Sequence, residues 1–450
     1  MSGESEKRQF YKSVVALVLP MALQNLINVG VTSADVIMLG RVGETALSAS
    51  SLAGQVQFIM TLFFFGLTSG AAVLTAQYWG KKDLRTIEKV LGIALRFSLI
   101  VGILFTAVVQ IFPYQVMRLF TPEQPVIEEG VQYLRIVSWS YILIAITQVY
   151  LNIMRSVERV IISTVVYLVS LLTNILLNAI FIFGLLGVPA MGIRGAALAT
   201  LIARFVELAI VAVYAIRHSD LVRFRLSDLF ASDKLLFKDF LTYAIPVTAN
   251  ELMWGLGSSM NTLIVGHMGS AAVAANSVAQ VTRQLSTVIA FGIANAAAIL
   301  LGKCIGENDY DRARVYSKRL IRLTLAAGGV GAAVILIVRP IVLATMTLTP
   351  AAQGYMSVMM LVMAYFSFCQ AYNTTLVVGV FRSGGDTRFG LALDVGFMWG
   401  FSILLGALAA FVFHWGVIPV YLLLMSDEIV KIPITTWRYK TMKWLRNVTR

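Results

Sequence analysis

The stretch PMALQNLINVGVTSADVIMLGRVG at residues 20–43 returns 226 positions later as PVTANELMWGLGSSMNTLIVGHMG at residues 246–269. Without a gap, the match continues to residue 85 and aligns Pro20 with Pro246, Gly40 with Gly266, Phe65 with Phe291, Gly80 with Gly306 and Asp83 with Asp309. An internal repeat in an apolar chain indicates two similar helix bundles with a site between them, an arrangement typical of membrane transporters.

The composition is that of a membrane protein. Of the 450 residues, 58% are hydrophobic and 13% are charged, whereas soluble globular proteins carry about 25% charged residues. A helix of about 20 apolar residues crosses a bilayer. We predict twelve such spans, at residues 12–39, 52–79, 87–112, 126–153, 161–186, 194–217, 236–266, 277–305, 313–338, 353–380, 389–413 and 417–440. Continuous apolar runs favour helices over a barrel, so the predicted fold is an all-α integral membrane protein.

The arrangement of spans and charges predicts the topology. Six spans in each half make the repeat parallel, because both halves then begin and end on the same side. We predict an N-terminal six-helix lobe at 1–217, an inter-lobe linker at 218–238 and a C-terminal six-helix lobe at 239–450. The net charge of +13 comes mostly from alternate loops and the chain ends, which is the positive-inside pattern. It predicts a multi-pass protein of the inner (cytoplasmic) membrane with both termini in the cytoplasm. The loops would contact lipid headgroups, and nucleic acid is not an expected partner.

Three motifs give the chain a specific resemblance over essentially its whole length. Pro20, Asp35 and Gly40 lie on the first predicted helix, GVPAMGIRGAALAT at 187–200 enters the sixth, and RSGGDT at 382–387 follows the tenth. The second motif is the most specific, and its Gly and Ala residues allow close helix packing. The chain resembles the bacterial-type MATE (multidrug and toxic compound extrusion) family, within the multidrug/oligosaccharidyl-lipid/polysaccharide exporter superfamily.

A polar stripe follows the first predicted helix. Gln24, Asn28, Thr32 and Asp35 recur at spacings of four, four and three, so they share one face. An ionisable group inside a membrane costs at least a few kcal/mol and needs a reason. Asp35 could be a structural residue held by neighbouring helices, but the resemblance implies that it belongs to the ion-coupling site of the N-terminal lobe. The other three are candidates for the substrate cavity.

The fifth predicted helix carries two amides, Asn174 and Asn178, one turn apart on a shared face. Buried amides commonly hold helices together, which is one interpretation. The resemblance implies instead that both join the Asp35 network as ion-coupling residues. Some members of the family have Asp where this chain has Asn178, and this difference leaves the coupling ion open between H⁺ and Na⁺. No metal is predicted unless the transporter is sodium-coupled, in which case Na⁺ would bind at Asp35.

The seventh predicted helix has a stripe of its own, formed by Glu251, Trp254, Ser258 and Asn261 at spacings of three, four and three. The repeat places Asn261 opposite Asp35, so the carboxylate has moved to Glu251 and the two lobes are not chemically equivalent. Glu251 is either an ion-coupling residue, a group that attracts cations into the cavity, or a structural residue. The other three are cavity candidates. Arg283 and Asp394 are left without an assigned role.

The resemblance implies a secondary active exporter of amphipathic or cationic organic compounds, coupled by antiport to H⁺ or Na⁺. It would work by alternating access, as a monomer without a cofactor. The main alternative is a flippase for a lipid-linked precursor, which Asp35 and Glu251 disfavour because such cargo is anionic. An enzyme is disfavoured because the three histidines are scattered along the chain. A channel is disfavoured because the sequence contains no repeated selectivity filter.

Overall fold

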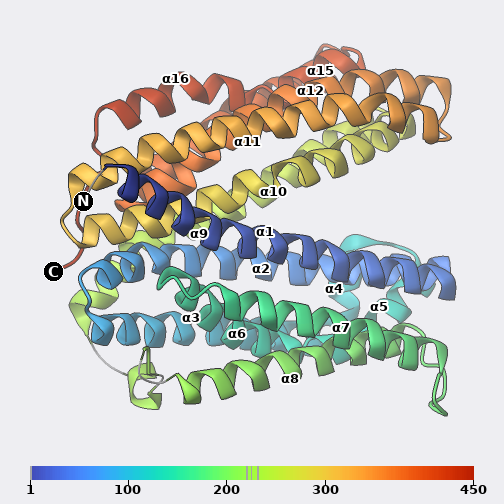
Figure 1. Ribbon diagram of the computed structural model, residues 1–450. Helices are drawn as coiled ribbons and strands as arrows, with labels where there is room; N and C mark the ends of the chain where they lie inside the picture. Colours follow the sequence, from blue (N-terminus) through green and yellow to red (C-terminus); the bar gives the residue numbers. More distant parts are fainter. Residues whose placement is uncertain (1–2, 219–220, 224, 231–232) are drawn as a thin grey trace. The chain divides into compact units, whose positions relative to one another are not determined.

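The computed structural model describes residues 3–218, 221–223, 225–230 and 233–450 (Figure 1). Almost all of these residues are helical, and none of them lies in a strand. The predicted all-α membrane fold is therefore confirmed.

In the first half, each predicted span falls on helical structure. The elements are α1 (Gly3–Val42), α2 (Glu44–Gly80), α3 (Leu84–Ile111), α4 (Pro113–Phe120), α5 (Gln124–Val137), α6 (Ser140–Ser156), α7 (Ile161–Phe183), α8 (Ile193–Arg217) and the short η1 (Leu226–Leu229). The fourth predicted span is not one straight helix, because α5 and α6 meet at a bend of 52°.

In the second half, the helices match the predicted spans in the same way. The elements are α9 (Lys234–His267), α10 (Ser270–Gly306), α11 (Tyr310–Thr345), α12 (Pro350–Thr374), η2 (Thr375–Phe381), α13 (Thr387–Phe397), η3 (Met398–Ile403), α14 (Leu404–Ala407), η4 (Leu408–Val412), α15 (Val417–Leu424) and α16 (Asp427–Lys440). Within the described residues, nine helices are long and apolar enough to cross a membrane, and the bent α5–α6 pair makes a tenth. The other two predicted spans are helical, but α9 is less apolar and the last is broken between α15 and α16.

The repeat is visible in how two of the helices begin. Asp83 caps α3 by accepting a hydrogen bond from the Thr86 backbone N–H at 3.1 Å. Asp309, which aligns with Asp83, caps α11 by accepting from the Arg312 backbone N–H at 3.0 Å. A side-chain oxygen at this position satisfies a backbone donor that the first turn of a helix leaves unpaired. An aspartate N-cap therefore begins the third helix of each half.

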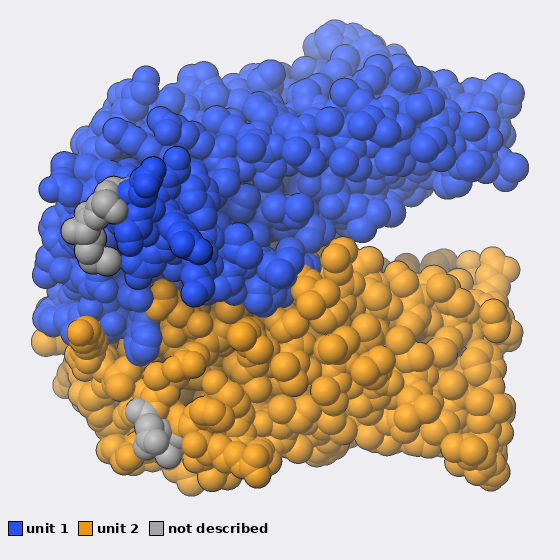
Figure 2. Space-filling view, in the orientation of Figure 1, with its two compact units in different colours: residues 1–22, 76–81, 245–450 blue, residues 23–75, 82–244 orange. Residues whose placement is uncertain are grey.

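The chain divides into two compact units (Figure 2). Unit 1 comprises residues 1–22, 76–81 and 245–450, and unit 2 comprises residues 23–75 and 82–244. The start of α1 and the end of α2 thus belong to unit 1, although the rest of both helices belongs to unit 2. These boundaries differ from those of the predicted lobes and linker, and the assignment of lobes stays a prediction.

Each unit has its own apolar core. In unit 1, α10, α11 and α12 lie side by side (Figure 1), and four methionines of α12 are completely buried in the core between them: Met356, Met359, Met360 and Met363. In unit 2, the core is built from α2, α3, α5 and α6 around buried residues such as Met60, Phe64 and Tyr141. The buried α12 methionines therefore pack a helix bundle and do not line a cavity.

Two glycines allow the end of α2 to approach α10 closely within unit 1. A Cβ atom added to Gly306 would lie 1.9 Å from the Gln77 carbonyl oxygen, and one added to Gly80 would lie 2.1 Å from the Lys303 carbonyl oxygen. Gly80 aligns with Gly306 in the repeat, and Gln77 with Lys303. The two contacts are therefore equivalent, and both need a residue without a side chain.

We expect Gly306→Ala to destabilise the protein, because the added methyl group meets backbone atoms that cannot rotate away. Overpacking of this kind costs about 1–3 kcal/mol. The matched control is Gly329→Ala on α11, where a Cβ atom would meet no atom within 4 Å and where alanine favours the helix. Thermal unfolding in detergent should show a lower midpoint for Gly306→Ala alone. Equal midpoints for both variants would contradict the close approach.

Candidate functional site

The centre of the candidate site is a chain of hydrogen bonds that joins three helices of unit 2. Asn178 of α7 donates from Nδ2 to Asp35 Oδ1 of α1 at 2.5 Å and to Asn174 Oδ1 at 3.2 Å. Asn174 in turn donates from Nδ2 to Thr200 Oγ1 of α8 at 3.4 Å. Both asparagines are buried. The structure thus brings together Asp35, Asn174 and Asn178, while their role in ion coupling stays a prediction.

The Asn178 side chain can serve Asp35 in either of its protonation states. Its NH₂ group donates to the carboxylate, whereas its own Oδ1 is buried and meets no donor among the described residues. An amide carries both donors and an acceptor. If Asp35 held a proton, a rotation of the amide would let Oδ1 accept a hydrogen bond from the carboxylic acid. The pair is therefore suited to a carboxyl group that gains and loses a proton.

A cavity of about 620 Å³ opens beside Asp35. Asn28 and Thr32 of the predicted stripe line it together with Asp35 and Asn174, and α2 contributes further polar groups from Gln55, Gln57 and Thr61. Polar groups along α1 and α2 thus face the same space. This cavity lies entirely within unit 2.

Gln24, a predicted cavity residue, is not among the residues that line the cavity beside Asp35. Its side chain is buried between helices, where Nε2 donates to Thr164 Oγ1 at 2.9 Å and to the Val160 carbonyl at 3.3 Å. Its Oε1 accepts from Arg155 at 3.5 Å. All its hydrogen-bonding groups are used by α6 and α7, so Gln24 holds helices together and does not line the cavity beside Asp35.

Three of the described residues that line this cavity are charged: Asp35, Arg204 and Glu207. Arg204 and Glu207 of α8 form an ion pair at 2.5 Å, and the Glu207 side chain is only 2% exposed. Arg204 also interacts electrostatically with Asp35. Because Arg204 is neutralised by Glu207, the cavity keeps one negative charge when Asp35 is ionised. A single proton or monovalent cation would balance it.

Glu251, the second acid predicted as an ion-coupling residue, lies in unit 1 and already has a counter-ion. Arg382 donates from Nη2 to Glu251 Oε1 at 2.6 Å, and both side chains are mostly buried. The pair ties α9 to the glycine-rich turn that follows η2. This geometry favours the structural interpretation of Glu251, because a balanced charge has no need of a further cation.

The remaining candidates on α9 are not gathered at a site by the structure. Trp254 and Ser258 are exposed, and Asn261 is partly buried with an Oδ1 atom that meets no donor among the described residues. Their part in a substrate cavity stays a prediction. Among the described residues, no three Cys, His, Asp or Glu side chains are grouped so as to hold a metal ion.

Comparison with known proteins identifies the family of the chain. A family model described as MatE matches residues 20–180 and 246–408. The chain belongs to the MatE family. It is 24% identical over 406 residues to the probable multidrug resistance protein YoeA of Bacillus subtilis strain 168, covering 90% of this chain and 88% of YoeA. It is 27% identical over 301 residues to the probable multidrug resistance protein NorM of Rhizobium meliloti strain 1021, covering 66% of this chain and 64% of NorM.

A solved structure supports the same fold. The crystal structure of a MATE protein in the bent conformation matches with a TM-score of 0.88 at 20% identity, covering 97% of this chain and 96% of that one. The MatE-family chain is therefore an all-α, multi-pass membrane protein whose relatives are transporters. At this level of identity, the likeness to the crystal structure concerns the fold alone.

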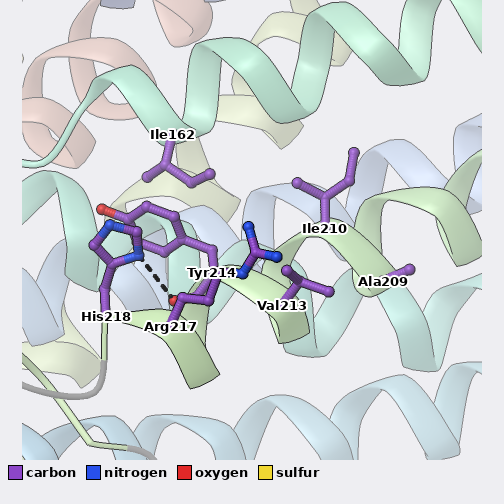
Figure 3. A pocket seen from close by; sticks show the side chains of 7 residues that line it. All are labelled: Ile162, Ala209, Ile210, Val213, Tyr214, Arg217 and His218. Carbon is purple, nitrogen blue, oxygen red and sulfur yellow. Dashed lines mark hydrogen bonds between the residues drawn. The ribbon is translucent and has the colours of Figure 1, made fainter.

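A second cavity of this MatE-family chain lies between the start of α7 and the end of α8 (Figure 3). It measures about 370 Å³ and is mainly apolar, with Ile162, Ile210 and Val213 along it and Arg217 and His218 at one end. His218 Nδ1 contacts the Tyr214 carbonyl at 3.3 Å. No predicted site residue lines it, so it does not belong to the candidate site.

Arg204 and Glu207 were not among the site residues predicted from the sequence. Their spacing of three residues on the sixth predicted helix is a sufficient signal for the pair. It carries no information that the pair faces Asp35, because that depends on how α8 packs against α1 and α7. Of the cavity-lining residues, Tyr133 and Tyr167 were missed for the same reason.

Proposed function

We propose that this MatE-family protein is a secondary active exporter of amphipathic or cationic organic compounds, driven by antiport of H⁺ or Na⁺. The observation that carries the proposal is the unbalanced charge of Asp35 in the polar cavity of unit 2, bonded to an amide that has a free acceptor oxygen. The similarity to YoeA and NorM, which are probable multidrug resistance proteins, agrees with it. The protein would act as a monomer in the inner (cytoplasmic) membrane, with both termini in the cytoplasm.

The chemistry follows from charge balance. With Asp35 ionised, the cavity is negative and attracts an organic cation; with Asp35 protonated or holding Na⁺, the cavity is neutral and the organic cation loses its partner. Coupling requires that the ion and the exported compound favour different conformations, because a ligand with equal affinity for both states shifts nothing. Neutralisation of Asp35 therefore provides a means by which an inward flow of cations releases substrate outside.

Expression of the protein in a bacterium that lacks its own efflux pumps should raise the ethidium concentration needed to stop growth by several-fold. The reason is that an exporter lowers the internal concentration of the dye. The matched control is the Asp311→Asn variant, whose carboxylate is 94% exposed on α11 and which should protect the cells equally. Unchanged ethidium sensitivity, together with a cell-envelope defect when the native gene is deleted, would replace the drug exporter with a lipid-precursor flippase.

A further inference from the structure

Unit 1 contains a buried cluster of charges in which three carboxylates surround one ammonium group. Lys431 Nζ of α16 lies 2.9 Å from Glu428 Oε1, 3.1 Å from Asp394 Oδ1 and 3.3 Å from Asp427 Oδ2. The Lys431 side chain is 4% exposed. Three carboxylates with one ammonium leave two negative charges in excess. Such an excess is costly away from water, and a bound proton reduces it.

Asp394 has a second contact that repeats the arrangement at Asp35. Asn250 of α9 donates from Nδ2 to Asp394 Oδ2 of α13 at 3.0 Å. Asn250 is 5% exposed, and its Oδ1 is buried without a donor among the described residues. Asn178 beside Asp35 has the same arrangement. In both pairs, the amide donates to the ionised carboxylate and keeps a free oxygen that could accept from the protonated carboxyl group.

Each half pairs one acid with one amide across its first helix and its fifth span, although at different positions: the repeat places Asn250 opposite Gln24 and Asn261 opposite Asp35. α1 and α9 are the first helices of the two halves, and α7 and α13 lie within their fifth spans. In unit 2, the acid Asp35 is on the first helix and its amide is on the fifth; in unit 1, the amide Asn250 is on the first helix and the acid Asp394 is on the fifth. The two halves therefore differ in which of the two helices carries the acid and which carries the amide.

The sixth span of each half supports the same correspondence. Arg204 follows Gly192 by twelve residues, as Glu428 follows Gly416, and in both cases the partner charge comes three residues later, at Glu207 and Lys431. The two ion pairs thus occupy equivalent positions with reversed polarity. The Arg204–Glu207 pair lines the cavity beside Asp35. The Glu428–Lys431 pair of unit 1 lies at the corresponding position of its sixth span.

Among the three carboxylates, Asp394 is the one placed to exchange a proton. Its side chain is 21% exposed, compared with 8% for Asp427 and 9% for Glu428. Glu428 is held through both oxygens, by Lys431 and by Asn373 Nδ2 at 2.8 Å, as Asp394 is by Lys431 and Asn250. The greater exposure of Asp394 to water is therefore what distinguishes it. Among the described residues, further charged or titratable groups interact with the cluster: Arg283 of α10 and Cys369 of α12 act on Glu428, and Tyr365 of α12 acts on Asp427.

We propose that Asp394 is a second proton-binding residue of the transport cycle, with Asn250 as its switching partner and Lys431 as a fixed counter-ion. The ligand is a proton and not a metal cation, because the Lys431 ammonium already occupies the space that the three carboxylates share. The proton passes to water when the substrate binds and returns from water when the substrate leaves. The inference rests on the proposed antiport function and extends it to a site in each unit.

The test counts the protons that purified protein in lightly buffered detergent releases when saturating ethidium is added, using a pH-indicator dye. Asp394→Asn and Asp35→Asn should each release about half as many protons as the wild type, and the double variant almost none. The exposed control Asp311→Asn should match the wild type. Asn250→Leu keeps the charge of the cluster but removes the acceptor, so it should also lower the release and serves if Asp394→Asn does not fold.

The outcomes separate this inference from the proposed function. Wild-type release by both Asp394→Asn and Asn250→Leu would overturn the assignment of Asp394 and leave Asp35 untouched. Reduced release in Asp394→Asn with wild-type release in Asp35→Asn would support Asp394 and overturn Asp35 as the coupling residue. Ethidium binding without any proton release from the wild type would overturn both assignments as proton sites.

Discussion

Replacing Asp35 with Asn is expected to abolish gradient-driven export of organic cations, with a loss of tenfold or more in the initial rate. The substitution keeps the shape of the side chain and its hydrogen bond to α7, but it removes the one charge of the cavity that the Arg204–Glu207 pair leaves unbalanced. A side chain that cannot gain or lose a charge cannot link the cation to the substrate. The measurement is ethidium efflux from energised cells at matched membrane levels of protein.

The matched control for this prediction is again Asp311→Asn, which removes an exposed carboxylate from α11. It should leave the rate of efflux unchanged. Asp35→Glu keeps the charge while moving it by one methylene, and it should retain part of the rate. Wild-type efflux by Asp35→Asn would show that the coupling ion binds elsewhere.

Replacing Lys431 with Met is expected to cause a large loss of stability. The change would leave Asp394, Asp427 and Glu428 together without the ammonium that contacts all three. Removing one partner of a buried ion pair costs about 3–5 kcal/mol. Thermal unfolding in detergent near neutral pH should show a markedly lower midpoint. The deficit should shrink as the pH falls, because protonation removes the negative charges that Lys431 had balanced.

Lys318→Met provides the control for the change of side chain, since Lys318 is exposed on α11. Its midpoint should stay close to that of the wild type at every pH. Unfolding of Lys431→Met at the wild-type temperature near neutral pH would contradict the three ion pairs of Lys431 with Asp394, Asp427 and Glu428.

Much of the fold could be predicted from the sequence because it depends on local properties. Apolar runs set the positions of the helices, and the aligned residues Asp83 and Asp309 set where α3 and α11 begin. The 52° bend between α5 and α6 and the break between α15 and α16 were not predicted. Neither break contains a Pro or Gly: Ser138 and Trp139 separate α5 from α6, and Met425 and Ser426 separate α15 from α16. The usual helix-breaking residues therefore give no signal there.

For the candidate site too, the sequence predicts which residues share a helix face but not which residues from distant parts of the chain meet. Helical periodicity placed Asn28, Thr32 and Asp35 on one face, and all three line the cavity. The partners of Glu251 and Asn250 lie 131 and 144 residues away, and no spacing in the chain reveals such pairs. Glu251 therefore looked like an unpaired acid of the membrane, whereas Asp394 had no neighbour that gave it a role. Only the contacts of α9 with Arg382 and with Asp394 of α13 distinguish the two acids.

Coupling of a cation gradient to export through Asp35 can be measured in proteoliposomes loaded with ethidium. A proton gradient and a sodium gradient would be imposed separately, with the wild type and Asp35→Asn run side by side. We predict that one of the two gradients drives efflux by the wild type and that Asp35→Asn shows no gradient-driven efflux. Gradient-driven efflux of equal rate in both proteins, or no efflux by folded wild type under either gradient, would contradict coupling through Asp35.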